Sequence, residues 1–277
     1  MIRHPAVEGR FYASTEYSVF NQLQEIEEIA KYPVPGETFG RISGAILPHA
    51  AHMYSAYQTV PFFRYLNKEE YYPETFVILN PNHTGIGPPI SVDAHDAWNN
   101  CIGDVRIDKD LAEQLPYPRE TSAQRNEHSA EVLIPFIQYY MNDQNIKIMP
   151  ICLKDQRASS CQKLAADLIS ASTSLGRNML LLASSDFSHF LSPGTGYSMD
   201  QLVLEQIERK DIFALEKTVK DHSISVCGYG PIMTLMSYSS LLFGEYSSSI
   251  LARGHSGEIH PSREVVDYIS MLYYSTK

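Results

Sequence analysis

The run Phe76-Val77-Ile78-Leu79-Asn80-Pro81-Asn82-His83 begins with four apolar residues and ends in a polar, proline-containing turn and a histidine. Two more runs have this form: Ala45-Ile46-Leu47-Pro48-His49, and Met179-Leu180-Leu181-Leu182-Ala183, which leads into Ser184-Ser185-Asp186-Phe187-Ser188-His189. Short runs rich in Ile, Leu and Val are typical of buried strands in a parallel sheet. Open α/β sheets bind ligands beyond the carboxyl ends of their strands. The three runs therefore predict that three imidazoles meet at one sheet edge.

The rest of the chain alternates apolar strand-like runs with amphipathic segments. This pattern predicts a three-layer α/β fold, with a mostly parallel or mixed central sheet and helices on both faces. Residues 50–72 are predicted to be rich in turns. No segment has the composition of a linker, so residues 1–277 are predicted to form a single domain. Further strands are predicted at 90–93, 146–153 and 265–274, and helices at 16–30, 127–140, 158–171, 200–209 and 231–242. The stretch Ile107-Asp108-Lys109-Asp110 offers an N-cap to a short helix that ends before Pro116.

Composition excludes several classes of protein. The net charge is −10 and no cluster of Lys or Arg occurs, which argues against a nucleic-acid partner. The first residues lack the apolar core of a signal peptide, and no apolar run approaches the roughly 20 residues that span a bilayer. Four cysteines without Cys-x-x-Cys spacing do not form a disulfide framework. We therefore expect a cytoplasmic protein with reduced thiols and no membrane association.

Two of the histidines stand at matched positions. His49 and His83 each follow a proline at the end of a predicted strand, where proline restricts the backbone. A single histidine at a strand end often only caps or packs. Two at equivalent strand ends favour a shared role.

Asp186 and His189 follow the third run and are three residues apart. If Ser185 or Asp186 caps a helix, the two side chains lie on one side of its first turn. A carboxylate beside an imidazole fixes the tautomer and raises the basicity of the ring. Alternatively, Asp186 is only a helix cap and His189 faces solvent.

Cys227 lies in Val226-Cys227-Gly228-Tyr229-Gly230-Pro231, directly before a predicted helix with proline near its first turn. A thiol at a helix amino terminus is expected to be stabilised as the thiolate, the form that binds metal or attacks carbon. The alternative is a small buried hydrophobic residue, the usual fate of a free cysteine. We adopt that interpretation for Cys101, Cys152 and Cys161.

Glu127 and His128 precede a predicted helix. They either extend the site and hydrogen-bond to its ligands or form a charged pair that caps the helix. Four further histidines are expected to lie in exposed loops: His52, His95, His255 and His260.

Three kinds of function remain open from these residues. Two histidines and a thiolate suit a divalent first-row metal such as iron(II) or zinc, with Asp186 and His189 as acid–base groups beside it. A metal-free thiol hydrolase would use Cys227 as nucleophile, His189 as base and Asp186 to orient the base, but it leaves His49 and His83 without a role. The third is a binding protein without turnover.

Several ordered motifs give the chain a resemblance to the Memo family, called AmmeMemoRadiSam system protein B in bacteria and archaea. The resemblance runs nearly end to end. The motifs that carry it are Pro5-Ala6-Val7-Glu8-Gly9-Arg10-Phe11-Tyr12, Leu47-Pro48-His49-Ala50, Pro81-Asn82-His83-Thr84-Gly85-Ile86-Gly87-Pro88-Pro89, Asp104-Val105-Arg106-Ile107-Asp108, Glu127-His128-Ser129-Ala130-Glu131, Ser184-Ser185-Asp186-Phe187-Ser188-His189 and Val226-Cys227-Gly228.

The resemblance implies a fold similar to that of the LigB-type extradiol dioxygenases, which hold non-haem iron(II) and cleave catechol rings. It implies that His49, His83 and Cys227 are metal ligands and that Asp186 and His189 line the same pocket. Those dioxygenases have glutamate where Cys227 stands, so the resemblance does not imply ring cleavage. It makes iron(II) the expected metal, with copper or zinc as alternatives. The expected substrate is an unidentified small molecule or peptide, and the expected partners are a radical-SAM protein and an AMMECR-type protein.

The sequence departs from the family pattern in two places. It has His49-Ala50-Ala51-His52 where the family commonly has His-Ala-Gly-Tyr, and Asn80 where glycine commonly precedes the proline. Loss of the glycine is expected to tighten the loop, and His52 adds an imidazole close to the pocket. These changes bear on the shape of the substrate more than on metal binding.

Overall fold

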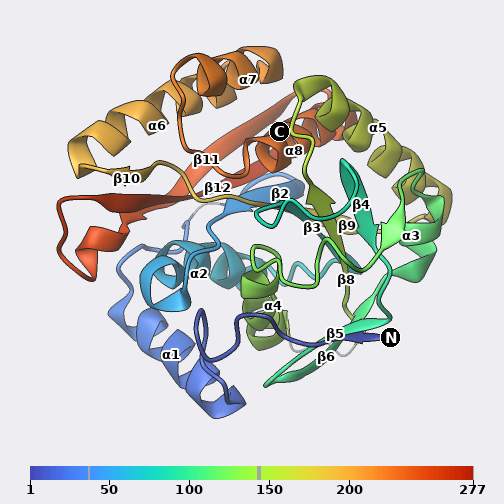
Figure 1. Cartoon of the computed structure of the whole chain (residues 1–277), viewed down its shortest axis with the longest axis horizontal. Helices are drawn as coiled ribbons and strands as arrows, with labels where there is room; N and C mark the ends of the chain where they lie inside the picture. Colours follow the sequence, from blue (N-terminus) through green and yellow to red (C-terminus); the bar gives the residue numbers. More distant parts are fainter. Residues whose placement is uncertain (37, 142–144, 277) are drawn as a thin grey trace.

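A computed structural model describes residues 1–36, 38–141 and 145–276. Its strands form one twelve-stranded sheet, whose main path runs β1-β5-β6-β8-β3-β9-β2-β12-β10 (Figure 1). The four central strands are parallel to one another, and β12 is antiparallel to β2 and to β11. The strands are β1 (Ile2–Arg3), β2 (Ile42–Leu47), β3 (Thr75–Pro81), β4 (Ile90–Asp93), β5 (Ala97–Asn100), β6 (Gly103–Ile107), β7 (Arg119–Glu120), β8 (Lys147–Leu153), β9 (Met179–Ser184), β10 (His189–Leu191), β11 (Tyr246–His255) and β12 (Val265–Ser275).

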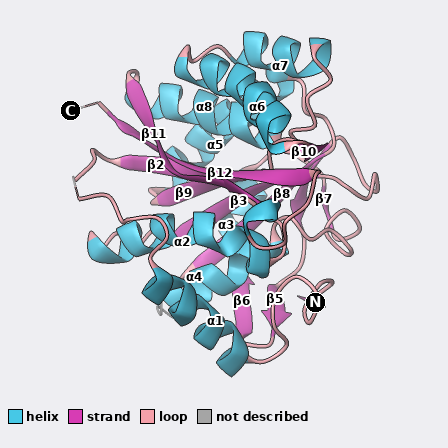
Figure 2. Ribbon diagram, turned by 90° about the vertical axis from the view of Figure 1, so that its left-hand side faces the viewer, coloured by secondary structure: helices cyan, strands magenta, loops and turns pink. Residues whose placement is uncertain are grey.

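Helices cover both faces of the sheet, as predicted. Figure 2 shows α5, α6, α7 and α8 on one face and α1, α2 and α4 on the other. The helices are α1 (Glu16–Ile29), α2 (His52–Lys68), α3 (Lys109–Gln114), α4 (Ile134–Met141), α5 (Ala158–Leu175), α6 (Pro193–Glu208), α7 (Ile212–Asp221) and α8 (Tyr229–Phe243). A 3₁₀ turn (Glu131–Leu133) precedes α4, and another (Ser256–Glu258) follows β11. The α/β fold class is therefore confirmed.

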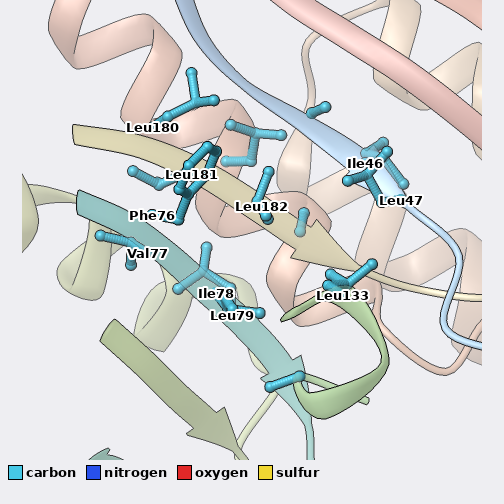
Figure 3. Close-up of a cluster of buried hydrophobic side chains, with 14 of the residues drawn as sticks. Ile46, Leu47, Phe76, Val77, Ile78, Leu79, Leu133, Leu180, Leu181 and Leu182 are labelled. Carbon is cyan, nitrogen blue, oxygen red and sulfur yellow. The ribbon is translucent and has the colours of Figure 1, made fainter. Parts of the chain in front are cut away.

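The central strands supply the middle of the hydrophobic core. Side chains of β2, β3 and β9 lie together between the helical layers (Figure 3), and every residue of these strands is buried. This explains why their sequences read as unbroken apolar runs, without the alternation expected of a half-exposed strand. The three strands predicted from the runs that lead to His49, His83 and His189 are therefore confirmed.

Most of the other predicted elements are confirmed, with small changes at their ends. Asp108 caps α3 through its side chain, within the stretch predicted to supply that cap, and Thr15 caps α1 in the same way. In contrast, α6 begins at Pro193, seven residues before the predicted start, because Ser192 is its cap. The hairpin of β5 and β6, the strands β10 and β11, and the helix α7 were not predicted.

The prediction of turns over residues 50–72 is wrong, because α2 occupies most of this segment. Its buried side chains include Ser55, Gln58 and Thr59 as well as aromatic residues, which obscures the apolar stripe that marks a helix. Pro61 lies within the helix, and a proline at such a position argues against predicting a helix from the sequence. The predicted helix at 127–140 also begins late. Residues 127–130 are irregular or in a turn, residues 131–133 form a 3₁₀ turn, and the α-helix starts at Ile134.

Within the described ranges, no helix combines the length and apolar character needed to cross a membrane.

Candidate metal site

Three residues from distant parts of the sequence lie together at the carboxyl edge of the central sheet. His49 follows β2, His83 follows β3, and Cys227 precedes α8. Their ligand atoms all lie within 4.8 Å of one another. The Cys227 Sγ atom is 3.1 Å from His49 Nε2, and the His49 and His83 ring centroids are 5.3 Å apart. The structure thus brings together the two imidazoles and the thiol that the sequence analysis selected.

The ring of His49 has a fixed tautomer. The Ser184 hydroxyl donates to the Ser129 carbonyl oxygen at 2.6 Å, so its oxygen must accept the hydrogen bond from His49 Nδ1 at 2.7 Å. The Nε2 atom therefore carries the lone pair that faces Cys227. Burial lowers the pKa of His49 well below its ordinary value, with further lowering from the neighbouring His128 and His83 rings. His49 is accordingly a neutral imidazole with Nε2 ready to bind a metal.

The ring of His83 is oriented by Glu127, a fully buried carboxylate. His83 Nδ1 lies 2.9 Å from Glu127 Oε1, and the His83 backbone N–H donates to Oε2 at 2.6 Å. Burial alone would raise the pKa of Glu127, but hydrogen bonds from His83 and Ser129 outweigh it and lower the pKa to about 2. An ionised carboxylate only accepts, so His83 Nδ1 donates and Nε2 is the nitrogen left for a metal. Burial alone would lower the pKa of His83, but Glu127 raises it, so a bound metal would have to displace any proton on Nε2. A carboxylate behind a histidine is a common arrangement at protein metal sites.

Cys227 lies at the helix start that the sequence predicted, but the expected thiolate is wrong for the metal-free protein. Burial and then the nearby Asp186 carboxylate raise the pKa of Cys227 well above its ordinary value. These effects exceed the stabilisation that the amino terminus of α8 offers a thiolate. The protonated thiol is therefore the donor in its contact with His49 Nε2, and a bound cation would have to displace this proton.

Neither Ser185 nor Asp186 caps a helix, so the condition under which Asp186 and His189 would share a helical turn is not met. Residues 185–188 are irregular and lead into β10. The Asp186 Oδ1 atom accepts the backbone N–H of His49 at 2.8 Å, while the Asp186 backbone N–H points to Cys227 Sγ at 3.2 Å. Burial raises the pKa of Asp186 to about 6. Asp186 thus links the loops that carry two of the candidate ligands.

His189 is half-buried and is held by Ser225, not by Asp186. Its backbone N–H donates to Ser225 Oγ at 2.8 Å, and its Nδ1 donates to the Ser225 carbonyl oxygen at 2.8 Å. Among the described residues, no hydrogen bond joins His189 to Asp186 or Cys227. The predicted acid–base pair is therefore close in space but not hydrogen-bonded.

A fourth imidazole, His128, belongs to the same cluster. Its ring centroid is 4.8 Å from that of His83 and 5.5 Å from that of His49, and Phe11 contacts it at 4.9 Å. The ligand atoms of His83, Glu127 and His128 form a second group within 4.8 Å. From the sequence, Glu127 and His128 either extend the site or form a charged pair that caps the helix. In the structure they precede the helix and face the site.

Two of the histidines predicted to be exposed are buried. His52 is the first residue of α2, and its Nε2 donates to the Val132 carbonyl oxygen at 2.8 Å. His95 is buried against Asp93, with 2.6 Å between Nδ1 and Oδ1. His255 ends β11 and is half-buried, and only His260 is exposed as expected. Of the remaining thiols, Cys152 and Cys161 are buried as predicted, whereas Cys101 is half-buried.

A cavity of about 1170 Å³ lies elsewhere, over β5, β6 and α4, and no histidine or cysteine lines it. Carboxylates and lysines at its rim pair with one another, as Lys109 does with Asp96. The donor chemistry therefore favours the imidazole–thiol cluster as the candidate site.

The donor set fits a borderline or soft divalent metal. Two imidazole nitrogens with fixed tautomers and one sulfur are the ligands that zinc, iron(II) and copper accept, whereas calcium and magnesium require oxygen. Three protein ligands also leave coordination positions for water or a substrate.

Replacing Glu127 with glutamine is expected to lower metal affinity roughly 10–100-fold, because the amide no longer fixes the tautomer of His83 as an ionised carboxylate does. Isothermal titration calorimetry with the metal measures this affinity. Glu120→Gln is the matched control, since Glu120 also accepts backbone N–H bonds in this region but contacts no histidine. Equal affinity of the Glu127→Gln variant and the wild type would contradict the orienting role.

Known proteins resemble the chain over its whole length. The family model described as "Memo-like protein" matches residues 3–272. A MEMO1 family protein of Methanobrevibacter smithii is 34% identical, over 99% of this chain and 100% of its own length. One from Archaeoglobus fulgidus is 33% identical over 98% and 99%, and one from Thermotoga neapolitana is 32% identical over 98% and 99%. The crystal structure of an uncharacterized Escherichia coli protein has a TM-score of 0.52 at 13% identity, covering 85% of this chain and all of that one, which supports the fold alone.

Proposed function

We propose, from the premise that this chain belongs to the Memo-like protein family, that it holds a non-haem divalent metal between His49, His83 and Cys227. Iron(II) is the first candidate, and copper and zinc are the alternatives. The protein would use this metal for redox or other metal-dependent chemistry on a small molecule or a peptide. The observation that carries the proposal is that the ligand atoms of His49, His83 and Cys227 lie within 4.8 Å of one another, while the Nδ1 atom of each imidazole is held by a hydrogen bond within the protein.

The residues around the three ligands have separate tasks in this proposal. The metal, when bound, supplies Lewis acidity or an electron to whatever occupies its open positions. Glu127 holds His83 in place from behind, and Ser184 does the same for His49. Asp186 ties the His49 loop to the Cys227 loop. We assign the acid–base role to Asp186 and His189, which face the site without being committed to each other.

A metal-free thiol hydrolase is a weaker alternative. It needs a thiol that ionises easily and a base in contact with it, but burial raises the pKa of Cys227 and the nearest imidazole is His49. The proposed base, His189, directs its Nδ1 atom to Ser225. A non-catalytic binding or scaffold protein, acting with a radical-SAM partner, is the second alternative. The radical-SAM and AMMECR-type partners and the cytoplasmic location remain predictions drawn from the family resemblance.

Metal loading separates these proposals. The wild-type protein, purified without oxygen and incubated with iron(II), is expected to retain about one ion per chain after desalting. Chelation should then abolish any turnover, and alkylation of Cys227 should be slow until the metal is removed. A protein that binds no metal, remains active in chelator and is inactivated rapidly by alkylation would instead be a thiol hydrolase. Binding of a partner that survives loss of Asp186 and His189 would favour the scaffold.

A further inference from the structure

The backbone is strained at one position that no helix end explains. Among the described residues, the non-glycine residues with positive φ are Ala30, Glu70, Phe190, Lys210 and Ser223. Four of these lie at or just after the last turn of α1, α2, α6 or α7, where a left-handed residue commonly ends a helix. Phe190 is the exception, with φ of 56° in the short strand β10.

Phe190 is the extra residue of a β-bulge. His189 pairs with Val266 and Leu191 pairs with Val265, so two steps along β10 oppose one step along β12. The left-handed position of such a bulge usually belongs to glycine, because a side chain there is strained. For a bulky residue this conformation is a clear outlier.

Packing of the ring within the protein does not account for this strain. The Phe190 side chain is 71% exposed, and its aromatic neighbour is His189, with 6.0 Å between the ring centroids. An exposed phenylalanine gains little from burial, and glycine would fit the backbone better. Strained backbone conformations cluster at active sites and ligand-binding positions, where the surrounding structure holds them in place.

Phe190 follows a residue that is fastened to the segment carrying Cys227. The preceding residue, His189, is fastened through its backbone and its ring to Ser225. Ser225 is two residues before Cys227, whose sulfur contacts His49 at 3.1 Å. The bulge thus keeps His189 turned toward the Cys227 segment while the next side chain, Phe190, is directed to solvent at the same edge of the sheet.

We propose that Phe190 is a ligand-binding residue that selects for a planar apolar group on the molecule bound at the metal. The ligand would combine a metal-binding donor group with a ring that extends past His189 and packs on Phe190. This inference rests on the proposed metal site and adds the chemical class of its ligand. The strain of the bulge is tolerated because it presents the ring outward.

A series of hydroxamates tests this with the metal-binding group held constant. Acetohydroxamate, benzohydroxamate, phenylacetohydroxamate and 3-phenylpropionohydroxamate carry no ring or a phenyl ring at increasing distance. In calorimetric titrations of the iron(II)-loaded protein, at least one phenyl-bearing member is expected to bind about tenfold more tightly than acetohydroxamate. Phe190→Gly should reduce that advantage to about twofold or less, leave acetohydroxamate affinity unchanged and not lower Tm.

Glu70→Gly is the matched control, because it also places glycine at a left-handed, exposed position but lies beyond the far end of α2. This variant should keep the full preference for the phenyl-bearing ligand. The inference is overturned if the wild type shows no such preference, if Phe190→Gly retains it, or if Phe190→Gly lowers Tm by several degrees, which would show a structural role. Failure of acetohydroxamate to bind the wild type would instead contradict the open metal position, and with it this inference.

Discussion

Replacing His49 with alanine is expected to reduce retained iron(II) from about one ion per chain to a trace. His49 contributes one of three protein ligands, and its Nε2 atom already faces Cys227 Sγ at 3.1 Å. Loss of a ligand should cost more than the roughly 10–100-fold in affinity that loss of an outer hydrogen-bond partner costs. The substitution should leave the loop in place, because the His49 backbone N–H still donates to Asp186. Elemental analysis after anaerobic loading measures the effect.

His52→Ala separates ligand loss from loss of a buried ring. His52 is also fully buried, but its Nε2 atom donates to the Val132 carbonyl oxygen and it belongs to neither cluster of ligand atoms. Both alanine variants should lose stability, while only His49→Ala should lose the metal. If His49→Ala keeps the wild-type metal content, His49 is not a ligand.

Replacing Arg3 with methionine is expected to lower the free energy of unfolding by about 3–5 kcal/mol, the cost of leaving a buried charge unpaired. Arg3 and Glu131 are both 2% exposed, with 2.8 Å between Nη1 and Oε2. The guanidinium also donates to the Gln124 and Glu127 carbonyl oxygens at 2.7 Å and lies 4.0 Å from the centre of the Trp98 ring. Arg3 therefore fastens the N-terminal segment to the loop that contains Glu127, the residue that orients His83. Denaturant unfolding provides the measurement.

Two further variants test the cause of that loss. Lys217→Met breaks the exposed pair between Lys217 and Asp221 on α7 and should change the free energy of unfolding little, because solvent screens this pair. Combining Arg3→Met with Glu131→Gln removes both charges, so the double variant should be more stable than the sum of the single losses implies. Additive losses, or a cost of Arg3→Met no larger than that of Lys217→Met, would show that the buried ion pair matters little.

The sequence predicts the centre of the molecule well and its outer parts less well. The strands β2, β3 and β9 are buried on both faces, so burial alone fixes their composition and their apolar runs are unmistakable. Because parallel strands end at the same edge, the meeting of His49 with His83 follows from the strand pattern. In α2, tertiary packing buries polar side chains as well as apolar ones, and this removes the periodicity that would reveal a helix.

The support of the candidate ligands could not be predicted, because it depends on contacts between distant segments. Glu127 orients His83 across 44 residues of sequence, and Asp186 bonds to the His49 backbone across 137. The pKa of Cys227 follows from its burial beside Asp186, which a helix-start motif does not reveal. The motif Glu127-His128-Ser129 is the part of the sequence that points to this support. Its two interpretations, as part of the site or as a charged pair that caps the helix, are separated only by the position of the turn before α4.

X-ray absorption at the iron K-edge of the iron(II)-loaded protein tests most directly whether two imidazoles and one thiolate bind the same ion. The predicted spectrum of the wild type contains one sulfur ligand and two histidine nitrogens, and the sulfur contribution disappears in Cys227→Ser. A wild-type spectrum with only nitrogen and oxygen ligands, unchanged in Cys227→Ser, would contradict the account.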